Sequence, residues 1–101
     1  MSKDENTKIA ETILKQLGGN RVRAMTGAKT FVAIERGLSF SFPNKTGPNV
    51  VRIVLNGRDE YEMAFWKKRG NKLSLVEEVT GVYAEDLVDF FEKHTGLYLS
   101  I

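Results

Sequence analysis

Apolar residues recur at helical spacing in two segments, one near each end of the chain. In the first segment they are Ile9, Ala10, Ile13, Leu14 and Leu17, and in the second they are Ala84, Leu87, Val88 and Phe91. Each set falls on one face of a helix, so the pattern predicts amphipathic helices over residues 4–17 and 84–95. Ser2 and Glu5 are spaced as a capping box for the first helix, and a glycine follows each helix as a stop signal.

Between the helices the pattern changes to the period of two that is typical of strands. The clearest case is "GLSFSFP", residues 37–43, in which leucine and phenylalanine alternate with serine. Further strands are predicted for "TFVAIE", "VVRIVL", "YEMAFW" and "LSLVEEV", which are rich in β-branched or aromatic residues, and a short basic strand for "NRVRAM". The "PNKTGPN" segment contains both prolines and predicts a loop.

The hairpin around Asn56-Gly57 can be assigned a register. A two-residue turn would set the apolar row of one strand against the charged row of the next. A loop of three or five residues matches the apolar rows instead, which are Val51, Ile53 and Leu55 on one strand and Tyr61, Met63 and Phe65 on the other. We therefore predict the longer loop, with Asn56 or Gly57 at positive φ.

These elements predict an α+β fold. We expect an antiparallel β-meander of five or six strands, flanked by an N-terminal and a C-terminal α-helix, in a single domain over residues 1–101. Both helices carry apolar stripes that need burial, so they should cover one face of the sheet. The other face should be open and carry Arg52, Glu62 and Trp66.

A glycine-rich basic stretch, "GGNRVRAMTGAKT" at residues 18–30, raises the question of a phosphate-binding loop. A Walker loop needs Gly, four residues and then Gly-Lys-Ser/Thr, because successive backbone N–H groups and the lysine converge on one anion. Here Ala28 separates Gly27 from Lys29, and Val22 stands where the first glycine is required. The stretch is better interpreted as a helix stop, the short basic strand and a "TGAK" turn.

The amino-acid composition limits the kinds of catalytic and metal-binding site that the chain can form. There is no cysteine, and His94 is the single histidine, so neither thiolate catalysis, a His pair for a metal nor a Ser-His-Asp relay is expected. Glu77 and Glu78 are neighbours in a predicted strand and should point to opposite faces. We expect no catalytic residue, metal or cofactor, and hence a non-enzymatic protein. With no apolar leader or bilayer-length apolar run, we also expect no membrane association and a cytoplasmic location.

Charge is unevenly distributed along the chain. Residues 15–72 carry twelve basic and four acidic side chains, whereas residues 77–101 carry one basic and six acidic ones. The stretch "FWKKRGNK", residues 65–72, places an aromatic ring beside cations, the combination that single-stranded nucleic acid favours. The candidate nucleic-acid-binding residues are Arg21, Arg23, Arg52, Trp66, Lys67, Lys68, Arg69 and Lys72. The alternative is that Trp66 covers part of the core and the cations keep a hairpin tip in solution.

The segments "AETILKQLGGNR", "MTGAKTF", "GLSFSFP" and "TGVYAEDLVDFFEKHTGLYLS" together resemble a family of small uncharacterised proteins encoded by bacteriophages and other bacterial mobile elements. The resemblance implies a bacterial cytoplasmic setting and carries no activity or site residue. It favours a second hypothesis, in which a phage-type accessory or inhibitor protein docks its acidic C-terminal helix or a sheet edge on a host or phage protein. A homodimer through the C-terminal tail or an edge strand is also compatible with the sequence.

Overall fold

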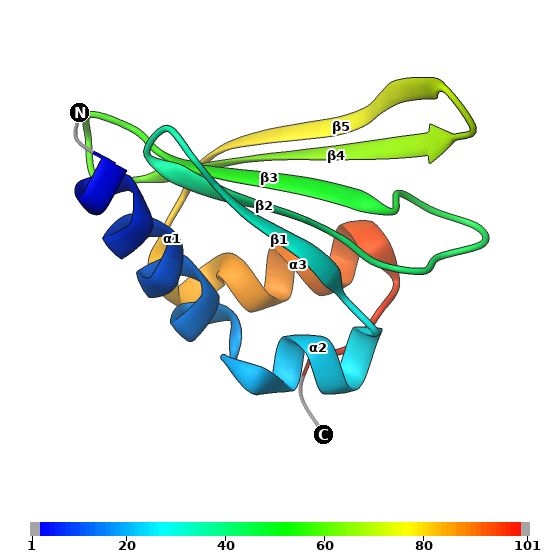
Figure 1. The fold of residues 1–101 in the computed structure, drawn as a ribbon, viewed down its shortest axis with the longest axis horizontal. Helices are drawn as coiled ribbons and strands as arrows, with labels where there is room; N and C mark the ends of the chain where they lie inside the picture. Colours follow the sequence, from blue (N-terminus) through cyan, green and yellow to red (C-terminus); the bar gives the residue numbers. More distant parts are fainter. Residues whose placement is uncertain (1–2, 100–101) are drawn as a thin grey trace.

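Five antiparallel strands form one sheet in which they follow one another in chain order, and the helices lie on one side of this sheet (Figure 1). The computed structural model describes residues 3–99. Its elements are α1 (Lys3–Leu17), α2 (Asn20–Thr26), β1 (Lys29–Ile34), β2 (Gly37–Ser41), β3 (Val50–Leu55), β4 (Tyr61–Arg69), β5 (Lys72–Val82), the 3₁₀ turn η1 (Ala84–Asp86) and α3 (Leu87–Thr95). The predicted α+β class, the meander and the two flanking helices are confirmed.

The β3–β4 hairpin has the predicted register. Ile53 pairs with Met63 and the adjoining apolar rows coincide, so a five-residue loop, 56–60, connects the strands. The prediction that Asn56 or Gly57 takes a positive φ is wrong. The residue of this loop with a positive φ is Asp59, at 60°. The side chain of Asn56 organises the loop by accepting hydrogen bonds from the backbone N–H groups of Arg58, at 2.8 Å, and Glu60, at 3.1 Å. This Asx-type turn moves the left-handed residue to the far side of the loop.

The basic strand predicted for "NRVRAM" is wrong, because residues 20–26 form the helix α2. Val22 and Thr26 are buried one turn apart on the same face of this helix. The hydroxyl of Thr26 donates to the carbonyl of Val22 at 2.5 Å and accepts from the N–H of Ala28 at 3.1 Å. Gly27 then ends the helix in the left-handed conformation that glycine adopts without steric cost, with φ 73°.

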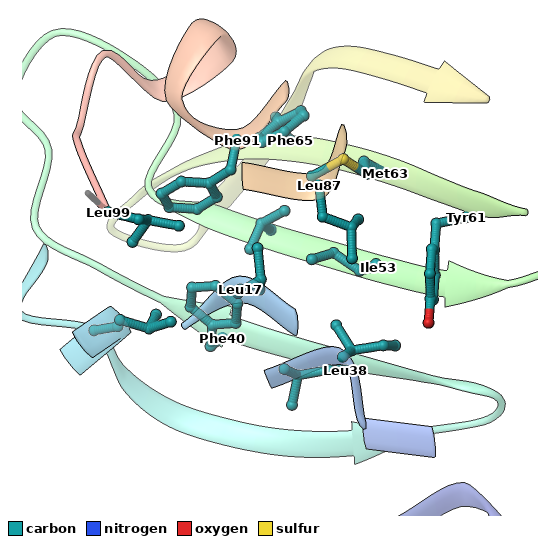
Figure 2. Packing of buried hydrophobic residues seen from close by; sticks show 14 of the residues in the cluster. Leu17, Leu38, Phe40, Ile53, Tyr61, Met63, Phe65, Leu87, Phe91 and Leu99 are labelled. Atoms are coloured by element: carbon teal, nitrogen blue, oxygen red, sulfur yellow. The ribbon is translucent and has the colours of Figure 1, made fainter. Parts of the chain in front are cut away.

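The hydrophobic core fills the space between the sheet and the two flanking helices (Figure 2). It takes Ile13 and Leu17 from α1 and Leu87 and Phe91 from α3. From the strands it takes Leu38, Phe40, Val51, Ile53, Tyr61, Met63 and Phe65. The Phe91 ring lies 5.3 Å from that of Phe42 and 6.0 Å from that of Phe40, which fixes α3 against β2 and the segment that follows it.

The C-terminal helix begins with one 3₁₀ turn and ends where the sequence predicts. Gly96 is its left-handed C-cap, with φ 75°, and its N–H donates to the carbonyl of Glu92. Leu99 of the apolar tail is buried, whereas the Tyr98 side chain points into solvent. Ser2 of the predicted capping box and the last two residues of the predicted tail lie outside the described residues.

Candidate functional site

The hairpin of β4 and β5 extends beyond the rest of the sheet. Val50, the first residue of β3, pairs with Trp66. Beyond that point, in the part of the chain that the structure describes, the two strands pair only with each other, through Lys67 with Ser74, Lys68 with Leu73 and Arg69 with Lys72. Gly70 makes the tight turn with φ 58°. We call residues 67–74 the distal ribbon.

At the base of the distal ribbon, Asn49 makes the hydrogen bonds to β4 that a neighbouring strand would otherwise make. Its side-chain amide donates to the carbonyl of Lys68 at 3.0 Å and accepts from the N–H of Lys68 at 2.8 Å. Its own backbone N–H donates to the carbonyl of Trp66 at 2.9 Å. One asparagine therefore satisfies backbone groups of β4 after β3 has ended, which keeps the ribbon aligned with the sheet.

Cations occupy both faces of the distal ribbon. Lys67, Arg69 and Lys72 share one face with Ser74 and line a hollow of about 270 Å³. Lys68 points to the other face, where it lines a second hollow of about 290 Å³ together with Lys29 at the start of β1. The remaining residues of the second hollow are Gly27, Ser41, Phe42, Pro43, Asn49 and Val50. Among residues 3–99, none of those that line these two hollows is acidic.

Lys67 is the one ribbon cation that has a defined protein partner among residues 3–99. Its ammonium group donates to the carbonyl of Asn44 at 2.6 Å, and the side chain is half-buried. Asn44 in turn donates to the carbonyls of Pro48 and Thr95, at 2.9 Å each. Lys67 thus connects the ribbon to the 43–49 loop and to the C-terminal end of α3, whereas Lys68, Arg69 and Lys72 are exposed.

Arg52 and Trp66 lie on the open face of the sheet, as predicted, but in an environment of mixed charge. They line a depression of about 420 Å³. Three carboxylates line it as well, Glu35 from the turn after β1, Glu62 from β4 and Glu78 from β5. Negative charge therefore outnumbers positive charge in the depression, and a phosphate backbone gains little attraction there.

The indole of Trp66 packs into the sheet surface. The side chain is half-buried, and its Nε1 is buried with no hydrogen-bond partner among residues 3–99. Its cross-strand neighbours are Val50 and Leu75. The ring is therefore less available for stacking on a base than an exposed tryptophan would be.

Arg21 and Arg23 lie on α2, in the helical layer. The Arg23 guanidinium lies over the ring of Phe31, 5.2 Å from its centroid, in a cation–π contact. Of the eight predicted residues, the distal ribbon thus brings together Lys67, Lys68, Arg69 and Lys72, and the structure adds Lys29. Lys29 was not among the predicted residues because the sequence assigned it to the "TGAK" turn. Its position directly before a predicted strand is the signal that could have placed it at an end of the sheet.

The residues considered for catalysis lie apart. His94 packs between rings, with its centroid 5.1 Å from that of Phe65 and 6.1 Å from that of Phe90. Glu77 pairs with Phe65 and Glu78 with Ala64, so the two carboxylates point to opposite faces of the sheet. Within residues 3–99 no group of three or more histidine, cysteine, aspartate or glutamate side chains is placed to hold a metal ion.

Comparisons of the chain with protein-family models, curated proteins and solved structures find no match. No helix formed by residues 3–99 is both long and apolar enough to cross a membrane.

Proposed function

We propose that this protein is a non-enzymatic binding module that associates with nucleic acid through the distal ribbon. The observation that carries the proposal is the grouping of Lys29, Lys67, Lys68, Arg69 and Lys72 around two hollows without a carboxylate in their lining. Such a group of cations attracts polyanions by releasing their condensed counterions. The setting that goes with this proposal is the bacterial cytoplasm, which the family resemblance implies.

The shape of the site favours contacts to phosphates over contacts to bases. The ribbon projects from the sheet and carries cations on both faces, and a two-stranded ribbon fits the roughly 12 Å major groove of B-DNA. Trp66 lies at the base of the ribbon with its Nε1 buried, so it contributes mainly to packing. We therefore expect weak binding with little sequence preference, to duplexes at least as well as to single strands.

The direct test is fluorescence anisotropy with labelled duplex and single-stranded oligonucleotides of mixed sequence at several salt concentrations. The variant combines Lys68→Ala, Arg69→Ala and Lys72→Ala, which truncate exposed side chains and leave the Lys67–Asn44 hydrogen bond intact. We expect it to bind at least tenfold more weakly and to lower the slope of log K against log salt by about 2 to 3.

A matched control separates local contacts from net charge. Lys3→Ala, Lys8→Ala and Lys15→Ala together remove the same charge from exposed positions of α1. This control should bind nearly as well as the unmodified chain. The proposal would be contradicted if both triple variants bound oligonucleotides equally weakly. It would also be contradicted if the unmodified chain showed no binding at tens of micromolar in about 50 mM salt, where charges are least screened.

Trp66 distinguishes phosphate contacts from base stacking. Trp66→Leu removes the aromatic ring and Trp66→Phe keeps one. We expect the two variants to bind single strands with affinities that agree within about twofold. A loss of about 1 to 3 kcal/mol confined to the leucine variant would instead assign a stacked base to this ring.

A protein partner is the second candidate function, and a different observation favours it. The outer strand β5 exposes Leu73, Leu75 and Val76, which are 55%, 48% and 51% exposed. Exposed apolar residues on an unpaired edge are suited to pairing with another strand. A phage-type accessory or inhibitor protein could use this edge. It would then bind no oligonucleotide, and its capture of a partner would survive the ribbon triple substitution.

A further inference from the structure

The outer edge of β5 lacks the usual protection against pairing in its first half. β5 is the last strand of the sheet, and within residues 3–99 no strand covers its other side. Edge strands are commonly blunted by charges, proline or bulges. Between Lys72 and Glu77 the edge has neither a charge nor a proline, and its apolar side chains are about half exposed. The irregularity in its pairing with β4 falls at Val76, after a regular stretch over residues 72–75.

Charge changes sign along this edge. Lys72 begins β5 next to Arg69 across the hairpin, and Glu77 and Glu78 follow the apolar stretch. An antiparallel partner that carries the same sequence presents its acidic end to the basic end of the first strand. The edge is therefore complementary in charge to a second copy of itself, and that copy would also cover the exposed leucines.

We propose that two copies of this chain pair through their β5 strands, antiparallel, about a two-fold axis at Leu75. This register sets Leu75 opposite its own copy and brings Lys72 of each copy near Glu77 of the other, which lies on the same face of the sheet because Arg69 pairs with Lys72 and Phe65 pairs with Glu77. A two-fold axis at Glu77 or at Glu78 would set like charges opposite one another, which is destabilising. The product is a continuous ten-stranded sheet with the two distal ribbons pointing in opposite directions.

The expected dimer is weak. A single pair of strands covers less surface than the roughly 1,200 Å² at the lower limit of stable interfaces. We therefore expect sedimentation velocity to show a monomer at low micromolar concentration and a growing dimer fraction at hundreds of micromolar, with less dimer at high salt. A chain that stays monomeric over this whole range overturns the proposal. It does so even if the β5 edge pairs with a strand of an unrelated protein.

A single engineered cysteine tests the register, because the natural chain has none. Residues directly opposite in an antiparallel pair have Cα atoms about 4.5 to 5.5 Å apart, within the span of a disulfide. Leu75→Cys should therefore form a disulfide-linked dimer under mild oxidation. Val32→Cys on the opposite edge strand β1 is the control, since Val32 and Leu75 are both 48% exposed. Equal yields from the two variants, or a higher yield from Val32→Cys, overturn the assignment to β5.

A charge swap tests the complementarity independently of oxidation. Lys72→Glu alone, or Glu77→Lys with Glu78→Lys, should reduce the dimer fraction at least fivefold at the same protein concentration. The combination of all three substitutions restores opposite charges in the reversed sense and should recover the dimer. Circular dichroism melting shows whether each variant folds, and a folded triple variant that remains monomeric contradicts the proposal. No nucleic acid is needed in these experiments, so their outcome is separate from that of the oligonucleotide titration.

Discussion

Tyr61 on β4 donates its hydroxyl hydrogen to Oε1 of Gln16 on α1 over 2.8 Å, and joins residues 45 positions apart in the chain. The tyrosine ring is buried at the edge of the core, with 4% of its surface exposed, and its hydroxyl points toward the helix (Figure 2). This hydrogen bond fixes the last turn of α1 to the sheet. It also places a titratable group inside the fold.

The stability of the protein should fall at alkaline pH because of Tyr61. Burial, and to a lesser extent the carboxylate of Asp59, raise the pKa of this hydroxyl above its ordinary value near 10. The folded state therefore keeps the proton while the unfolded chain loses it. The stabilising contribution is complete below about pH 10 and decreases as the pH rises above the unfolded pKa.

Tyr61→Phe tests this linkage. At pH 7 we expect it to cost about 1 kcal/mol through the lost hydrogen bond. The difference between the two proteins should shrink as the pH rises from 9 to 11 in urea unfolding curves, because phenylalanine does not ionise. Tyr83→Phe removes a hydroxyl from a side chain that is 53% exposed and should leave the unfolding curves unchanged. A difference that stays constant with pH would contradict the assignment.

Gly37 should not tolerate any side chain. It pairs with Val54, and a Cβ at residue 37 would overlap the carbonyl oxygen of Ile53 in the backbone of the neighbouring strand. The strand cannot move aside without losing its ladder, so Gly37→Ala should cost at least about 2 kcal/mol. Gly57→Ala is the control, because nothing lies within 4 Å of a Cβ there, and it should change stability by less than about 1 kcal/mol. Equal midpoints in urea would show that β2 and β3 are farther apart than described.

The register of β3 and β4 could be predicted from the sequence because the apolar rows match only across a loop with an odd number of residues. The helix α2 could not, since "RVRAM" alternates as a strand does and its two buried positions are too few to define a helical stripe. The environment of Arg52 could be predicted only in part. Glu62 was expected on the same open face, whereas Glu35 and Glu78 come from the turn after β1 and from β5, and only strand order and register bring them beside it.

Asn49 should control the order of the distal ribbon. Asn49→Ala removes both side-chain hydrogen bonds to Lys68 and should cost about 1 to 2 kcal/mol, with faster hydrogen exchange at the Lys68 amide. Asn49→Asp keeps an acceptor for the Lys68 N–H but loses the donor, so its effect should be about half as large. Hydrogen exchange followed by NMR measures both. Protection at Lys68 that is unchanged in the alanine variant would mean that the ribbon is held by its own pairing alone.

Asp59 and Arg36 should respond in opposite ways to the same substitution. Both have positive φ, 60° and 56°, in loops at the same end of the sheet, and both carry the steric cost of that conformation. In Asp59→Gly that cost is removed, so we expect the free energy of unfolding to rise by up to about 1 kcal/mol.

The Arg36 side chain, by contrast, donates from Nε to the carbonyl of Leu55 at 2.9 Å and from Nη2 to that of Asn56 at 3.4 Å. Arg36→Gly relieves the backbone but loses these hydrogen bonds, so we expect a net loss of about 1 kcal/mol. Thermal and urea unfolding of the two variants give the signs directly, and a stabilised Arg36→Gly would show that its hydrogen bonds contribute less than the strain costs.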